Sequence, residues 1–126
     1  MPQLDPTIAI GLIKANVEDE ALDFKRTLSI ERKYDQAELI KDVLAMANTV
    51  RTAGNPCYII IGAKNGIIYD IRDLKLDDAS IQQIVNSRIA PVVKFSYYQL
   101  ELESKTIGVI EIPKSVDKPH FVENDF

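Results

Sequence analysis

Several residue types that build common functional sites are scarce or missing in this sequence. It has one cysteine, one histidine and no tryptophan among 126 residues. Cys57 alone cannot form an internal disulfide. Cys57 and His120 together are too few residues to form a Cys/His zinc site at any spacing. The composition therefore excludes disulfide-stapled secreted folds and zinc modules.

Long apolar runs are missing as well. No stretch approaches the roughly 18 apolar residues of a membrane-spanning helix. The first residues, Met1 to Ile10, have no basic region ahead of an apolar run. We therefore expect no membrane association and a cytoplasmic location.

Positive charge is in deficit, with 15 Lys and Arg against 19 Asp and Glu and a net charge of -4. The whole molecule therefore repels polyanions, and any nucleic-acid site must be a local patch. Hydrophobic residues make up 46% of the sequence, enough for one core. No internal repeat or Gly/Ser linker divides the chain, so we expect residues 1–126 to form one domain.

Motifs of common catalytic sites are also absent. There is no Gly-x-x-x-x-Gly-Lys-Ser/Thr phosphate loop, no Gly-x-Ser-x-Gly elbow and no second histidine to activate a nucleophile. Carboxylates remain as candidates, because Glu18 and Asp23 could both reach a hard divalent ion if the chain curls between them. The alternative is a solvated acidic loop followed by a strand residue that pairs with a nearby lysine or arginine.

Basic residues form the second candidate site. Lys25 and Arg26 precede Arg32 and Lys33, and these side chains could line a groove that meets phosphates. Tyr34 beside them could stack on a base. The alternative is an exposed strand and loop with ordinary basic residues.

Three further side chains have mainly structural interpretations. His120 is expected at the surface, where it could contact a phosphate, and Cys57 is expected in the core. Asn48 lies in the apolar stripe of a predicted helix. We favour a role in satisfying the backbone of a neighbouring loop over the presentation of its amide to a ligand.

Hydrophobic periodicity and turn residues predict the order helix, strand, helix, hairpin, helix, hairpin. The expected elements are a helix from Pro6 to about Asn16, a strand over 21–28, a helix from Asp35 to about Arg51, a hairpin over 57–71 with its turn at Asn65-Gly66, a helix capped by Asp77 or Asp78, and strands over 93–102 and 106–112 with a bulge or change of burial near Tyr97-Tyr98. This order predicts an α+β fold, with a mixed β-sheet and helices packed mainly on one face.

Segments spread over residues 18–121 together resemble the AlbA-type domain of Schlafen-like proteins. These segments are Leu22-Asp23-Phe24-Lys25-Arg26, Ala45-Met46-Ala47-Asn48-Thr49, Tyr58-Ile59-Ile60-Ile61-Gly62-Ala63, Ile89-Ala90-Pro91 and Lys118-Pro119-His120-Phe121. The resemblance implies an AlbA-like β-α-β-α-β-β core, here with an extra hairpin and an N-terminal helix. It also implies a nucleic-acid-binding module of bacterial transcriptional regulators, of a kind also described as a divergent ATP-binding domain. The chain would be an excised domain or a short member of the family.

Some relatives in that family cleave RNA with a divalent metal, Mg or Mn. The resemblance implies that Glu18 and Asp23 match two of the three metal-binding acids, whereas the third place falls on Lys64-Asn65, without a carboxylate. The Gly-Gly before the central strand is also altered, to Ala53-Gly54-Asn55-Pro56.

We therefore expect a non-catalytic module that binds DNA or RNA. The phosphate-binding residues would be Lys25, Arg26, Arg32, Lys33 and Lys64. The alternatives are a metal-dependent endoribonuclease that uses Glu18 and Asp23, a domain that binds ATP, and a protein-interaction domain that could form a homodimer.

Overall fold

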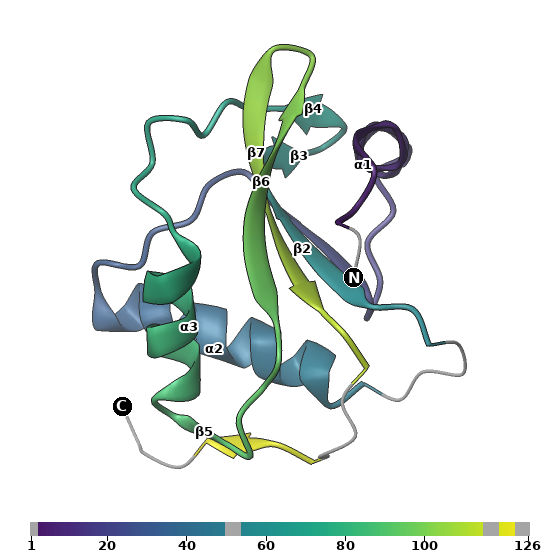
Figure 1. Cartoon of the computed structure of the whole chain (residues 1–126). Helices are drawn as coiled ribbons and strands as arrows, with labels where there is room; N and C mark the ends of the chain where they lie inside the picture. The colour runs from purple at the N-terminus through teal and green to yellow at the C-terminus, as the bar shows by residue number, and fades with distance from the viewer. Residues whose placement is uncertain (1–2, 50–53, 115–118, 123–126) are drawn as a thin grey trace.

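A computed structural model describes residues 3–49, 54–114 and 119–122 of the chain (Figure 1). Its elements in chain order are α1 (Pro6–Ala15), β1 (Leu22–Lys25), α2 (Lys33–Ala47), β2 (Cys57–Ile61), β3 (Ala63–Lys64), β4 (Ile67–Ile68), α3 (Asp78–Asn86), β5 (Ile89–Ala90), β6 (Ser96–Leu102), β7 (Lys105–Ile112) and β8 (Phe121–Val122). The α+β class expected from the sequence is confirmed.

The main sheet has four strands in the order β1-β2-β7-β6. β1 pairs with β2 in parallel, and the other two pairs are antiparallel, so the sheet is mixed. β2 is a central strand, and Ile59, Ile60 and Ile61 are fully buried, as a continuous apolar run predicts for a strand covered on both faces. β1 forms one edge of this sheet.

Helices cover the two faces of the sheet unequally (Figure 1). α2 and α3 pack against one face, in a core cluster that includes Leu39, Val43, Ile81, Ile59 and Ile61. α1 packs against the other face through Ala9 and Ile13, in a cluster with Phe24, Ile60 and Val109. The expectation of helices mainly on one face is therefore confirmed. None of the helices within the described ranges has the length and apolar character needed to cross a membrane.

The sequence places the helices well, with one shift at α2. Asp5 caps α1 by accepting from the N–H groups of Thr7 and Ile8, and Asp77 caps α3. α2 begins at Lys33, two residues before the predicted Asp35, which lies in the first helical turn. The helix ends at Ala47, with Asn48 as its C-cap, so the predicted end near Arg51 is wrong; Arg51 itself lies outside the described residues.

The predicted hairpin is shorter than expected. Asn65 and Gly66 have φ angles of 53° and 77°, which confirms the primed turn. The paired residues are only Ala63–Lys64 and Ile67–Ile68. The long hairpin over 57–71 is wrong because Gly62, with φ 99°, bends the chain after β2, which pairs with β1 and β7 instead.

The edge strands also differ in detail from the prediction. Leu28 lies beyond the end of β1 and packs in the cluster under α2 and α3, whereas Phe24 packs in the cluster under α1. β6 pairs with β7 in unbroken register, so it has no bulge. The alternative of a change of burial is confirmed, because Tyr97 is buried toward α2 and α3, and Leu100 toward α1.

Candidate functional site

The acidic candidates lie together at the free edge of β1. Glu18 precedes the strand, and its Oε2 atom accepts from the Phe24 N–H at 2.9 Å. Asp23 is on the strand itself, where alternation places it with Lys25 on the face toward α2. The Lys25 ammonium lies 3.2 Å from Asp23 and 2.7 Å from Asp42 of α2. The structure therefore brings Glu18 and Asp23 together and adds Asp42.

The two predicted acids have pKa values that are shifted in opposite directions. A hydrogen bond with Asp23 is the main cause that lowers the pKa of Glu18, and the Phe24 N–H lowers it further. Burial is the main cause that raises the pKa of Asp23, and the hydrogen bond with Glu18 adds to it. The pair therefore favours one shared proton as the pH falls.

The resemblance implies a third acid at Lys64-Asn65, and the structure places Lys64 beside Glu18. Its Nζ atom lies 3.4 Å from Glu18 Oε1 and donates to the Phe24 carbonyl at 3.1 Å. Glu18 and Asp23 thus each face an ammonium group. Within the described ranges, no group of three or more His, Cys, Asp or Glu side chains is placed to hold a metal ion. The described residues therefore do not complete a site for a divalent metal ion.

The five predicted phosphate-binding residues fall into two groups. Lys25 and Lys64 are ion-paired with acids. Arg26, Arg32 and Lys33 are exposed, and none of them forms an ion pair with a residue that the structure describes. The Arg26 guanidinium lies 4.7 Å from the centre of the Tyr69 ring, a cation–π contact.

The N-terminus of α2 carries Arg32 and Lys33. Arg32 is the N-cap residue and makes no side-chain capping hydrogen bond, whereas α1 and α3 are capped by aspartates. Tyr34, the residue after Lys33, has 73% of its surface exposed. Free N–H groups and the helix dipole favour anions at such an end. The basic side chains and the helix end therefore attract the same kind of ligand.

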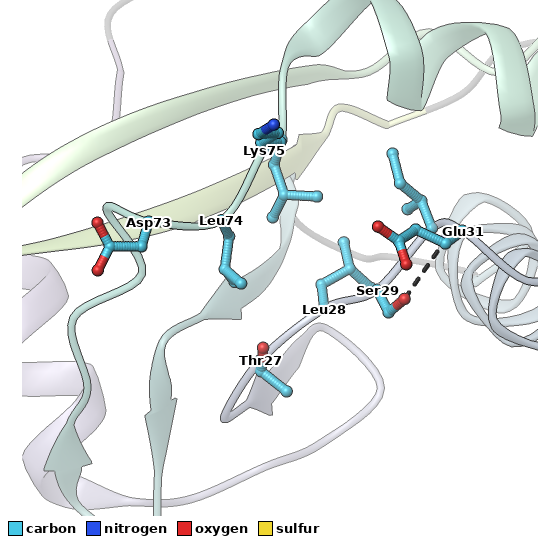
Figure 2. A pocket seen from close by; sticks show the side chains of 9 residues that line it. Thr27, Leu28, Ser29, Glu31, Asp73, Leu74 and Lys75 are labelled. Carbon is cyan, nitrogen blue, oxygen red and sulfur yellow. Dashed lines mark hydrogen bonds between the residues drawn. The ribbon is translucent and has the colours of Figure 1, made fainter.

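A hollow of about 420 Å³ lies beside this helix end, between the segment after β1 and the segment before α3 (Figure 2). Figure 2 shows Leu28 and Leu74 on its two walls, with Ser29 and Lys75 nearby. The sequence alone does not predict this hollow. Its walls, residues 27–31 and 73–76, are far apart in the chain, and neither carries a motif.

The structure corrects the interpretation of His120. Its side chain is 2% exposed, and its Nδ1 atom lies 2.6 Å from the Pro91 carbonyl oxygen, so it is a core residue. Asn48 has the structural role that we favoured, because its side chain bonds the backbone of His120. Cys57 is buried, as expected. Ala53 and Lys118 of the family-like segments lie outside the described residues.

Comparisons with known proteins support the fold and the family. No curated protein matches this chain. The structure is similar to the crystal structure of the DIP2311 protein from Corynebacterium diphtheriae, with a TM-score of 0.59 and 17% sequence identity over 94% of this chain. That match covers 23% of the DIP2311 chain, and the likeness concerns the fold alone. The family model for Schlafen, AlbA_2 matches residues 18–126, so this chain belongs to the Schlafen AlbA_2 family.

Proposed function

We propose that this domain binds nucleic acid without cleaving it, as a module of a bacterial transcriptional regulator. The observation that carries the proposal is the pair Arg32 and Lys33, exposed and without an acidic partner among the described residues, at the start of α2 where no side chain caps the helix. Positive side chains and free backbone N–H groups at one helix end are what a phosphate group needs.

Two neighbours would extend this contact beyond one phosphate. Tyr34 is exposed next to Lys33 and could stack on an unpaired base. Arg26 lies at the other end of the segment that lines the hollow, and its stacking on Tyr69 holds the guanidinium in place. A strand of nucleic acid that followed the segment from Arg26 to Arg32 would meet positive charge at both ends.

Lys25 and Lys64 would contribute less than the sequence suggests. Lys25 faces Asp23 and Asp42, and Lys64 faces Glu18. A phosphate that approached either ammonium would also meet the neighbouring carboxylate. In our proposal Arg26, Arg32 and Lys33 therefore supply most of the binding.

The test is binding of fluorescent single-stranded RNA and duplex DNA over a salt series, with and without Mn²⁺, followed by a denaturing gel of the same samples. We expect the ligand to stay intact, with a log-log salt slope of about -0.7 to -0.9 for each phosphate contacted. The variant Arg32→Ala/Lys33→Ala should bind more weakly. The matched control is Lys94→Ala/Lys114→Ala, which removes two exposed lysines from other parts of the chain.

One observation favours a second candidate, the metal-dependent endoribonuclease. Glu18 and Asp23 share a hydrogen bond, so two of the three acids that the metal-assisted reaction would use lie together, although Lys64 stands beside them where the third acid is implied. Cleavage that appears only with Mn²⁺ and disappears in Asp23→Asn would favour this enzyme over our proposal.

The same experiments also test a protein-interaction domain and an ATP-binding domain. No binding at low salt, together with a defined homodimer, would favour the protein-interaction domain. ATP binding rests on the family resemblance alone, since the sequence has no phosphate loop. Displacement of the bound nucleic acid by ATP would reveal ATP binding to this domain.

A further inference from the structure

We infer that the Lys64 ammonium stands in for a metal ion beside the Glu18 and Asp23 carboxylates, and that it prevents divalent metal ions from binding to this pair. The inference concerns the metal chemistry of the domain and does not depend on nucleic-acid binding.

The backbone fixes where residue 64 can reach. Gly62 turns the chain out of β2, and its N–H donates to the Lys25 carbonyl at 2.7 Å. A Cβ atom on Gly62 would lie 2.9 Å from the Tyr69 carbonyl oxygen, so this bend depends on glycine. β3 then lies beside β1, and the side chain at position 64 runs to the edge of β1.

Lys64 and Glu18 are held there by the backbone of one residue. The outward N–H of Phe24 donates to Glu18 Oε2 at 2.9 Å, and its outward carbonyl accepts from Lys64 Nζ at 3.1 Å. An ion pair of 3.4 Å also joins Lys64 directly to Glu18. The two side chains therefore satisfy an exposed strand edge as a neighbouring strand would.

The charges around the pair are already balanced in part. Glu18 faces Lys64, and Asp23 and Asp42 share Lys25. A divalent cation between Glu18 and Asp23 would lie close to two ammonium groups and would have to displace the one on Glu18. It would also compete with the Phe24 N–H for a Glu18 oxygen.

An acid at position 64 would reverse these conditions. Glu18, Asp23 and the introduced carboxylate would then present oxygen atoms near the Phe24 carbonyl, and oxygen is the ligand that Mg²⁺ and Mn²⁺ prefer. Removal of the ammonium without a new acid, as in Lys64→Met, would relieve the repulsion but add no ligand.

The test is titration of the full chain with Mn²⁺, followed by electron paramagnetic resonance and calorimetry, with no nucleic acid present. We expect Lys64→Glu to bind one Mn²⁺ at least about tenfold more tightly than the wild type. That gain should be lost in Lys64→Glu/Glu18→Gln. The matched control Lys94→Glu has the same charge change at an exposed lysine elsewhere and should gain nothing.

Two results would overturn the inference. One is a wild type that binds Mn²⁺ as tightly as Lys64→Glu does, and the other is an equal gain in Lys94→Glu. Circular dichroism reports whether Lys64→Glu folds. If it does not fold, Lys64→Met decides, because it should still bind Mn²⁺ more tightly than the wild type, and equal affinities would contradict the role of the ammonium. Since the assay contains no nucleic acid, failure of the proposed function would leave its result unchanged.

Discussion

The side-chain amide of Asn48 pairs with both backbone groups of His120, which is 72 residues later in the chain. The His120 N–H donates to Asn48 Oδ1 at 2.7 Å, and Asn48 Nδ2 donates to the His120 carbonyl at 3.0 Å. Asn48 is the C-cap residue of α2, and His120 directly precedes β8. This pair therefore ties the C-terminal segment to the end of the long helix.

The variant Asn48→Ala should lower the free energy of unfolding by about 2 kcal/mol, because it removes both part-buried hydrogen bonds between the Asn48 amide and the His120 backbone. Urea denaturation followed by circular dichroism measures this change. Gln83→Ala, an exposed substitution on α3, is the control and should change little. A loss below about 0.5 kcal/mol in Asn48→Ala would mean that water replaces the amide at no cost.

Two glycines should respond in opposite ways to substitution by alanine. Gly62→Ala should lower the free energy of unfolding by about 2 kcal/mol or more, because the residue has φ 99° and the new Cβ would lie 2.9 Å from the Tyr69 carbonyl oxygen. Gly11→Ala should raise it by about 0.5 to 1 kcal/mol, since that site is within α1 and has no atom within 4 Å of the new Cβ. Thermal unfolding of both variants tests the pair. A Gly62→Ala variant as stable as the wild type would refute the described bend after β2, and a destabilised Gly11→Ala would refute the open surroundings of Gly11 in α1.

Glu18 and Asp23 should influence the pH dependence of stability with opposite signs. The hydrogen bond with Asp23 lowers the pKa of Glu18 below its ordinary 4.5, so its contribution is present above that pH and is lost as the pH falls. Burial raises the pKa of Asp23 above its ordinary 3.8, so its contribution is present below that pH and is lost as the pH rises through the raised value.

The variants that test this are Glu18→Gln and Asp23→Asn, unfolded with urea at several pH values between 3 and 7. Relative to the wild type, Glu18→Gln should lose stability as the pH rises over this range, whereas Asp23→Asn should gain it. Parallel pH trends in the two variants would show that the carboxylates do not interact as described.

Local chemistry was enough to predict much of the fold. Asn65-Gly66 tolerates positive φ angles, Asp77 can accept from a backbone N–H, and the apolar run from Cys57 to Ile61 is typical of a strand covered on both faces. Each of these signals is contained in a segment of a few residues. The structure has the turn, the helix cap and the strand at the positions where these segments predict them.

The features that the sequence could not supply depend on long-range contacts. The length of the hairpin depends on which strands β2 joins, and the buried His120 contacts Asn48 and Pro91, which are 72 and 29 residues away in the chain. The approach of Lys64 to Glu18 crosses 46 residues, and no local pattern indicates it. The family resemblance named both positions, but the ion pair between them is visible only in the structure.

In our proposal, exposed basic residues at the start of α2 bind the phosphates of an intact nucleic acid. The most direct measurement is the salt dependence of single-stranded RNA binding for the wild type, Arg32→Ala/Lys33→Ala and Lys94→Ala/Lys114→Ala. We predict that the Arg32 and Lys33 variant loses about 0.7 for each phosphate contact removed from the slope of log affinity against log salt, while the control keeps the wild-type slope. No binding by the wild type at low salt, or equal slopes for the two double variants, would contradict the proposal.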